Sequence, residues 1–363
     1  MPADPCRTER VMRTMNMQSR TSSLFAIIMA GGKGERFWPA GRAMRPKQLL
    51  SLTSEKTMIE ETVQRLFPLI PPEQVLVITN RDYVEQIRDL LPIPSENVIG
   101  EPERRDTAPC VALATALVRR KDPDATMIIL PADHVIRPAK VFQDTLKRAA
   151  DQAQNGYLIT LGIPPSFPST GYGYLHLGAD TGTGFYPVLE FKEKPDQATA
   201  EAFLKDGNYR WNSGIFVWRA DTISEAFRRY APDLGKKLDA WAKGADFIQD
   251  FASCRKISID YAVMEKAENI IAVDAPFEWN DIGSWSSLRS FLPLDQNGNA
   301  SLGCAVAMDS SDNVFFSDDG TLIAAIGLHR TAVIKSGNAL LVCPLADEQK
   351  IKKILEKTKD SFK

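Results

Sequence analysis

The sequence is poor in the side chains that most often carry proton transfer and soft-metal binding. It has only three histidines in 363 residues, and none stands in an HExxH or similar ligand spacing, which disfavours histidine-based metal or triad chemistry. The five cysteines are odd in number, scattered, and never form a CxxC pair, so neither a disulfide framework nor a zinc site is indicated. We therefore expect a cytoplasmic protein.

An excess of charge of either sign is also missing. The formal net charge is −2, whereas a nucleic-acid partner normally requires a basic excess or a basic face. Hydrophobic residues make up 44% and charged residues 25%, which is ordinary for a globular chain. The apolar run 24–30 is short for a signal peptide and lacks a convincing cleavage site. We expect no nucleic-acid partner and no membrane association.

The length predicts one large α/β domain with a smaller appendage. Short β-branched runs alternate with segments of helical period, the pattern of a Rossmann-like, doubly wound sheet of parallel or mixed strands. The predicted strands are 24–30, 75–79, 126–130 and 157–162, and the predicted helices are about 57–67, 81–91, 107–121 and 138–154. Right-handed crossovers place the loops that follow these strands at one edge of the sheet, where ligands bind.

Four regions follow from this pattern. Residues 1–23 are expected to be a disordered N-terminal extension, or to precede the true start at Met12, Met15 or Met17. The main domain spans 24–290, and its less regular part, 170–283, is typical of a substrate lid. Short strands and turn dipeptides over 298–345 predict a small all-β module. Residues 346–363 are expected to form a C-terminal helix, with Ile351, Ile354 and Leu355 on one face.

A glycine-rich segment follows the first predicted strand. It reads Ala30-Gly-Gly-Lys-Gly-Glu-Arg-Phe-Trp-Pro39 and matches neither the P-loop nor the dinucleotide fingerprint. Its glycines let backbone N–H groups approach an anion, and the loop carries the cations Arg36, Arg42, Arg45 and Lys47. We interpret it as a cradle for a triphosphate; a glycine turn with a solvated basic loop is the alternative.

This segment, continued to Arg45-Pro-Lys-Gln48, resembles the signature of the sugar nucleotidylyltransferases, and its Trp-Pro form is similar to the mannose-1-phosphate guanylyltransferase group. Further matching segments cover roughly residues 24–345. They are Glu101-Pro-Glu-Arg-Arg-Asp-Thr-Ala-Pro109, Leu130-Pro-Ala-Asp-His134, Thr170-Gly-Tyr-Gly-Tyr174, Phe191-Lys-Glu-Lys-Pro195, Trp211-Asn-Ser-Gly-Ile-Phe216, Ser258-Ile-Asp-Tyr-Ala-Val-Met-Glu265 and Trp279-Asn-Asp-Ile-Gly-Ser-Trp285.

The resemblance implies a nucleotide-diphospho-sugar transferase fold with a C-terminal β-helical module that is often used in dimer contacts, so a homodimer is expected. It also implies the reaction of GTP with α-mannose 1-phosphate to give GDP-mannose and pyrophosphate, with Mg²⁺ as cofactor. The nucleophile of such a reaction is already an anion and needs no general base, which agrees with the scarcity of histidine.

The resemblance also implies residue roles. Arg36 and Lys47 would be catalytic, contacting the triphosphate and the sugar phosphate respectively. The nucleotide would be held by Gly31, Gly32, Lys33, Gly34, Arg105, Asp106, Thr107 and Ala108. The sugar phosphate would be held by Gly173, Glu193, Lys194, Asn212 and Asp260. Asp133 and Asp281 would ligate the metal, while His134 is interpreted as a structural neighbour.

Local alternatives exist for several of these residues. Asp133 alone could be a helix N-cap, and Glu193-Lys194-Pro195 or Asn212-Ser213-Gly214 could be turns. Asp106 stands where many guanylyl members have asparagine, so another base is open, as is another hexose or heptose 1-phosphate. A non-catalytic regulatory subunit is a further alternative, although such a protein would be free to lose Arg36, Lys47, Asp133 and Asp281.

Overall fold

The structure is a computed structural model that describes residues 23–32 and 34–362. The predicted N-terminal extension lies almost wholly outside the described residues, as does Lys33. Within the described part of the chain, no helix is long and apolar enough to cross a membrane.

The main sheet has nine strands within the described ranges, in the order β3-β2-β1-β4-β9-β6-β10-β8-β7. The four strands predicted from the sequence are confirmed. The strands are β1 (Leu24–Ala30), β2 (Val75–Asn80), β3 (Val98–Glu101), β4 (Thr126–Pro131), β6 (Leu158–Ile163), β7 (Tyr174–Leu177), β8 (Phe185–Lys192), β9 (Tyr209–Arg219) and β10 (Ile270–Asp274).

Helices cover both faces of this sheet, and successive side chains of β1 pack alternately against the helices of one face and of the other. Ala26 and Ile28 pack with α2, α3 and α5, whereas Phe25 and Ile27 pack with α4, α7 and α8. Such a strand, buried on both faces, needs an uninterrupted apolar run. The α-helices are α2 (Met58–Leu66), α3 (Val84–Leu90), α4 (Thr107–Lys121), α5 (Ala139–Ala153), α6 (Gln197–Asp206), α7 (Ala220–Tyr230), α8 (Pro232–Ala242), α9 (Phe247–Phe251), α10 (Trp285–Leu288) and α11 (Ile351–Glu356).

The predicted helices form, and a side chain caps the first turn of two of them. Thr57 caps α2 in a capping box with Glu60, and Asp106 caps α4. Single-turn segments complete the secondary structure. The 3₁₀ segments are η1 (Glu35–Phe37), η2 (Lys47–Leu49), η3 (Pro72–Gln74), η4 (Arg81–Tyr83), η5 (Ser95–Asn97), η7 (Arg289–Phe291), η8 (Leu345–Lys350) and η9 (Asp360–Phe362), and η6 (Asp260–Met264) is a π-helical turn.

The region 170–283 contributes to the central sheet as well as to its cover. Strand β9 runs antiparallel between β4 and β6, so Asn212-Ser213-Gly214 lies within a strand and the β-turn alternative is wrong. Polar residues and a glycine interrupt the apolar pattern there, and the register with β6 shifts between Thr160 and Gly162. Local pattern alone therefore missed this strand.

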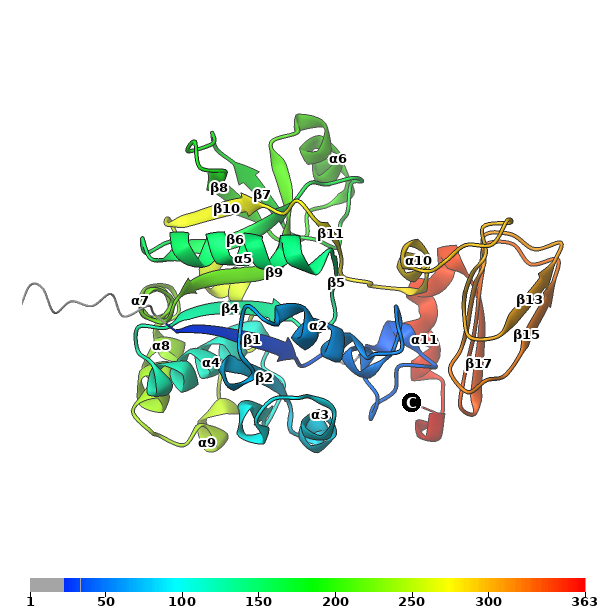
Figure 1. The fold of residues 1–363 in the computed structure, drawn as a ribbon, viewed down its shortest axis with the longest axis horizontal. Coiled ribbons are helices and arrows are strands. Elements are labelled where there is room, and N and C mark those ends of the chain that lie inside the picture. Colours follow the sequence, from blue (N-terminus) through cyan, green and yellow to red (C-terminus); the bar gives the residue numbers. More distant parts are fainter. Residues whose placement is uncertain (1–22, 33, 363) are drawn as a thin grey trace, which may run out of the picture.

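The C-terminal module lies beyond the carboxyl end of β1, with α10 and α11 between it and the main domain (Figure 1). Its strands are β12 (Ala300–Leu302), β13 (Ala305–Met308), β14 (Val314–Ser317), β15 (Ile323–Ile326), β16 (Thr331–Ser336) and β17 (Ala339–Pro344). The pairs β12–β14, β14–β16 and β13–β15 are parallel, the arrangement expected of a β-helical module. Only β16–β17 among its described pairs is antiparallel.

The module, the glycine loop and the chain end share one core. Phe37 of η1 packs edge-on against Trp285 of α10 with ring centroids 5.0 Å apart, and Trp285 contacts Phe316 of β14 at the same distance. The predicted C-terminal helix is interrupted: only Ile351–Glu356 is α-helical. Of the three residues predicted to share one face, Ile351 is buried, Leu355 is partly buried against the same core, and Ile354 is exposed.

Candidate active site

The conformation of the glycine loop between β1 and η1 is stabilised by hydrogen bonds from the side chain of Gln48. The buried Gln48 side chain donates its amide N–H groups to the carbonyl oxygens of Ala30, at 2.7 Å, and Gly32, at 3.3 Å. Gly34 has a φ of 65°, and a Cβ there would clash with the backbone nitrogen of Lys47. The loop thus requires glycine at this position, and its N–H groups are kept near the end of β1.

Lys47 joins the glycine loop to two other segments. Its side chain is buried, and its ammonium donates to Asp133 Oδ2 at 2.8 Å and to the backbone carbonyl of Asp281. Burial opposes ionisation of Asp133, but the Lys47 charge holds the pKa of that carboxyl below its usual value. The sequence-predicted residues Lys47, Asp133 and Asp281 are therefore brought together.

Asp281 reaches this position through a two-stranded ribbon. Strands β5 (Val135–Arg137) and β11 (Glu278–Asn280) pair antiparallel, with Asn280 opposite Val135. The chain then turns at Ile282, whose φ of 35° is strained for a β-branched residue. Asn280 Oδ1 accepts the Ile282 N–H at 2.7 Å and stabilises the turn. Pairing across the ribbon thus places Asp281 beside the segment that carries Asp133.

Tyr172 is a site residue that sequence reasoning missed. Its hydroxyl donates to Asp281 Oδ1 at 2.9 Å and fixes the direction of that carboxylate. Its ring packs against Trp211 and Trp279. The signal in the sequence was its place inside Thr170-Gly-Tyr-Gly-Tyr174, although nothing local identifies its partner.

His134 has a structural place. Trp279 Nε1 donates to His134 Nδ1 at 3.1 Å, which leaves the proton of the neutral ring on Nε2. Burial lowers the pKa of His134 to about 4. The imidazole is therefore neutral near pH 7.

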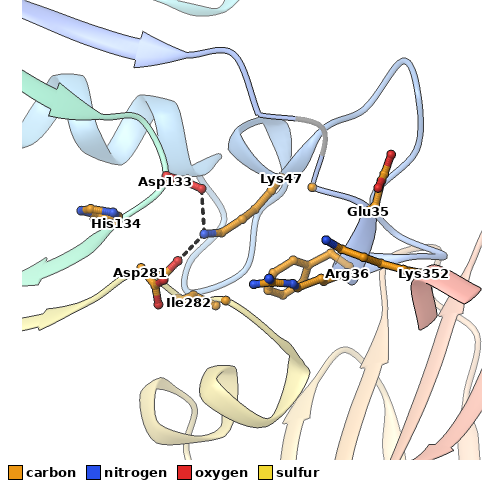
Figure 2. A pocket seen from close by; sticks show the side chains of 11 residues that line it. Glu35, Arg36, Lys47, Asp133, His134, Asp281, Ile282 and Lys352 are labelled. Carbon is orange, nitrogen blue, oxygen red and sulfur yellow. Dashed lines mark hydrogen bonds and ion pairs between the residues drawn. The ribbon is translucent and has the colours of Figure 1, made fainter. Parts of the chain in front are cut away.

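Lys47, Asp133 and Asp281 line a cavity of about 370 Å³ together with Gly34, Glu35 and Arg36. Figure 2 shows Lys47 between the two aspartates, with Arg36 on the other side of the cavity. The charged lining holds three cations and three carboxylates, among them Lys352 from α11. A cavity lined by both cations and carboxylates is suited to a phosphate chain with a bound cation.

Two of the four loop cations expected at the triphosphate lie elsewhere. Arg42 donates to Asn338 Oδ1 at 2.8 Å and to the Ser336 carbonyl at 3.0 Å. Arg45 forms an ion pair with Asp318 at 2.5 Å. Both guanidinium groups thus bind the C-terminal module, so the expectation was wrong for these two residues. The reason is that the loop also forms the interface with that module.

Asp133 and Asp281 are the candidate metal ligands. Among the described residues there is no group of three or more His, Cys, Asp or Glu side chains arranged to hold a metal. Mg²⁺ commonly takes one or two carboxylates and completes its shell with phosphates and water. The pair therefore fits Mg²⁺ bound together with a phosphorylated substrate, and does not fit a metal caged by protein alone.

A second, smaller cavity of about 170 Å³ meets the first at His134 and Asp281. Its lining includes Gly173, Glu193, Asn212 and Asp260, four of the five residues predicted for the sugar phosphate. A Cβ on Gly173 would come within 2.5 Å of Glu193 Oε2, so only glycine leaves that carboxylate in place. Lys194 is outside this lining and pairs with Glu193 Oε1 at 2.6 Å.

Asn212 and Asp260 are hydrogen-bonded to each other in this second cavity. Asn212 Nδ2 donates to Asp260 Oδ1 at 3.1 Å, and Asn212 Oδ1 accepts the Thr160 hydroxyl at 2.9 Å. Burial, with the nearby Glu193 charge, raises the pKa of Asp260 to about 7. Such partly buried amide and carboxyl groups are suited to hydrogen bonds with sugar hydroxyl groups.

The segment 105–108 begins α4. Asp106 Oδ1 accepts the Thr107 N–H at 2.8 Å, and Thr107 Oγ1 accepts the backbone N–H of Ile259 at 2.8 Å. The side chain of Asp106 is thus used as the helix cap. Arg105 is paired with Glu103 at 2.5 Å, and Ala108 is buried.

Glu101 is a second residue that sequence reasoning left without a role. It ends β3 and is 5% exposed, and its Oε1 has no hydrogen-bond partner among the described residues. Its Oε2 would lie 3.7 Å from a Cβ on Gly31, so the carboxyl borders the glycine loop. Burial raises the pKa of Glu101 to about 7. A buried carboxyl oxygen without a partner in the described residues, on a side chain beside a ligand loop, is consistent with a polar ligand group.

Comparison with known proteins agrees with this geometry. A family model described as nucleotidyl transferase matches residues 25–297, and one described as MannoseP isomerase/GMP-like beta-helix domain matches residues 303–358. The chain is 39% identical to a mannose-1-phosphate guanylyltransferase from Klebsiella pneumoniae and 38% identical to one from Escherichia coli, over 92% of this chain and 73% of each relative. A solved structure from Thermus thermophilus, titled mannose-1-phosphate geranyltransferase, superposes with a TM-score of 0.86 at 35% identity, covering 92% of this chain and 99% of that one.

Proposed function

Because the chain belongs to the nucleotidyl transferase family, we propose that it transfers a guanylyl group from GTP to α-mannose 1-phosphate. The products are GDP-mannose and pyrophosphate. One observation carries the proposal: a cavity lined by Arg36 and Lys47 meets, at Asp281, a cavity lined by hydrogen-bonding groups. This arrangement fits a triphosphate beside a sugar phosphate, and the relatives' names supply the two substrates.

The reaction needs alignment more than proton transfer. An anionic oxygen of the sugar phosphate attacks the α-phosphorus of GTP, and the bond from that phosphorus to the β-phosphate oxygen breaks. Lys47 lines the first cavity and is held by Asp133 and by the carbonyl of Asp281, a residue that both cavities share. Its charge reduces repulsion between the two anions. Arg36 serves the triphosphate in the first cavity.

Asp133 and Asp281 would hold Mg²⁺, which when bound supplies charge neutralisation at the phosphates. Tyr172 keeps the Asp281 carboxylate directed by its hydrogen bond. Treatment with a chelator is expected to abolish turnover, and added MgCl₂ to restore it. Turnover that persists in the metal-free enzyme would remove the metal from the proposal.

Glu101 is the residue that supports guanine. The ring nitrogen N1–H and the exocyclic amino group of guanine are adjacent donors, and a carboxylate accepts both. Glu101 is buried, borders Gly31, and has an oxygen without a partner among the described residues. Adenine and the pyrimidines do not present two such donors side by side, so this carboxylate would select GTP.

The function is tested with the purified full chain, a panel of nucleoside triphosphates and a panel of hexose and heptose 1-phosphates. Pyrophosphate release is expected to be fastest with GTP and mannose 1-phosphate. A faster reaction with another pair would replace the substrates but keep the chemistry. Absence of pyrophosphate release with every pair would favour the non-catalytic regulatory subunit.

The proposed enzyme is a homodimer that associates through the outer face of the C-terminal module. Val306 and Met308 of β13 and Ile326 of β15 are more than half exposed, and neighbouring apolar side chains on paired strands form a typical contact surface. Light scattering is expected to give twice the chain mass, and Ile326→Glu to give the monomer mass. A monomeric wild type would contradict this assembly; the cytoplasmic location stays a prediction.

A further inference from the structure

The chain end returns to the phosphate cavity. Lys352 lies on α11, close to the end of the sequence, and lines the same cavity as Arg36 and Lys47. Figure 2 shows its side chain reaching from the C-terminal helix into the space between Glu35 and Arg36. Lys352 also lines an adjoining groove.

The position of α11 is fixed by its own packing and by contacts of the η8 segment that precedes it. Ile351, next to Lys352, is 3% exposed and packs in the core that contains Phe37. Glu348 accepts the backbone N–H of Ser286 at 2.9 Å and its hydroxyl at 2.5 Å. Helix α11 is thus packed against η1, the η8 segment that leads into it is bonded to α10, and burial of Ile351 directs the neighbouring Lys352 toward the cavity.

Lys352 is not used in an ion pair within the described residues, so its ammonium group can bind a phosphate. Arg42 and Arg45 are bound to the C-terminal module, and Lys47 is paired with Asp133. Lys352 has no ion-pair partner among the described residues. Together with Arg36 and Lys47, it supplies the positive side-chain charge that the cavity lining offers a triphosphate.

The direction of the reaction assigns Lys352 to one part of the nucleotide. In an in-line displacement the attacking and leaving oxygens lie on opposite sides of the phosphorus. The hydroxyl-binding cavity adjoins the phosphate cavity at His134 and Asp281, so the sugar phosphate enters from that side. Figure 2 shows Lys352 at the opposite side of the cavity from His134, which is the side of the leaving group.

We propose that Lys352 binds the β- and γ-phosphates of GTP and the pyrophosphate that leaves, so that the C-terminal helix completes the active site. The inference rests on the proposed nucleotidyl transfer, but not on the identity of the base or the sugar. As the bond to the β-phosphate oxygen breaks, negative charge grows on that oxygen, and an ammonium group beside it lowers the barrier.

The experiment compares Lys352→Ala, Lys352→Arg and the control Lys353→Ala in the full chain. Lys353 is an exposed lysine of the same helix that is outside the lining of the cavity. The affinities for GTP, GMP and inorganic pyrophosphate are measured by calorimetry with Mg²⁺ and without sugar phosphate. A lost charge-assisted contact predicts GTP and pyrophosphate binding weaker by about ten- to a hundredfold in Lys352→Ala.

GMP affinity is expected to stay unchanged, because GMP lacks the phosphates that Lys352 contacts. Lys352→Arg is expected to recover part of the loss, and Lys353→Ala to behave as wild type; the same melting temperature confirms folding. Equal affinity of Lys352→Ala and wild type for pyrophosphate, or an equal loss for GMP, would overturn the inference. If binding depends on Lys352 while mannose 1-phosphate gives no turnover, the inference stands and the proposed sugar fails.

Discussion

Replacing Glu101 by glutamine changes one buried carboxyl into an amide of nearly equal size. The change separates two effects: the cost to stability when this buried carboxyl ionises, and its proposed part in recognising the base. Glu101 is 5% exposed, so its charge is poorly solvated. Burial raises its pKa from 4.5 to about 7, while the neighbouring Cys110 thiol and Arg104 guanidinium oppose the rise.

The stability effect has a definite sign. A carboxyl whose pKa is higher in the folded than in the unfolded state stabilises the fold while protonated, and this contribution is lost as the pH rises through the folded pKa. With values of 4.5 and about 7, the loss between pH 5 and pH 8 is about 2 kcal/mol. Glu101→Gln cannot ionise. Its free energy of unfolding relative to wild type is therefore expected to rise by that amount over this range.

The specificity effect follows from hydrogen bonding. A glutamine amide offers one acceptor and one donor. Its acceptor can pair with only one of the two guanine donors, whereas its acceptor and donor together match the amino group and the adjacent ring nitrogen of adenine. Leaving a buried donor unpaired costs about 1 to 3 kcal/mol. The ratio of kcat/KM for GTP to that for ATP is expected to fall about a hundredfold.

Urea unfolding at pH 5 and pH 8 measures the first effect, and pyrophosphate release with GTP and ATP measures the second. Wild-type kcat/KM for GTP should also fall below pH 7, since the carboxylate must be ionised to accept both donors, and the variant should lose this dependence. An unchanged GTP/ATP ratio in a folded variant would refute the base assignment. The same pH dependence of the unfolding free energy in Glu101→Gln and wild type would refute the claim that ionisation of the buried carboxyl destabilises the fold.

Three further substitutions test other parts of the site. Asp281→Ala is expected to lower kcat by about a hundredfold or more while the melting temperature stays near wild type; near-normal rates would remove Asp281 from the metal site. Gly173→Ala would place a Cβ 2.5 Å from Glu193 Oε2, so the KM for mannose 1-phosphate should rise with little change for GTP, and an equal effect on both substrates would contradict the assignment. Arg45→Ala removes the ion pair with Asp318, in which the Arg45 side chain is 42% exposed. The free energy of unfolding should therefore fall by no more than about 1 kcal/mol, and the affinity for GTP should not change. Weaker GTP binding would show that Arg45 belongs to the phosphate site.

Local pattern was enough for the elements that begin the fold. The apolar run 24–30 and the helical period of 57–67 are read from adjacent residues, and the structure confirms both as β1 and α2. Strand β9 could not be found this way, because Asn212 and Gly214 break its pattern and its stability comes from β4 and β6 on either side. Antiparallel insertion of β9 also makes the sheet mixed.

Short stretches of sequence were sufficient to identify the family and the chemistry, because both depend on residue types tied to phosphate binding and to a nucleophile that needs no base. Which charges meet depends instead on the folded chain. Folding sets Asp281 beside the segment of Asp133 through the ribbon of β5 and β11, directs Arg42 and Arg45 to the module, and brings Lys352 to the cavity. These contacts join segments that are far apart in the chain. Their positions depend on the packing of hydrophobic side chains such as Phe37, which local periodicity does not reveal.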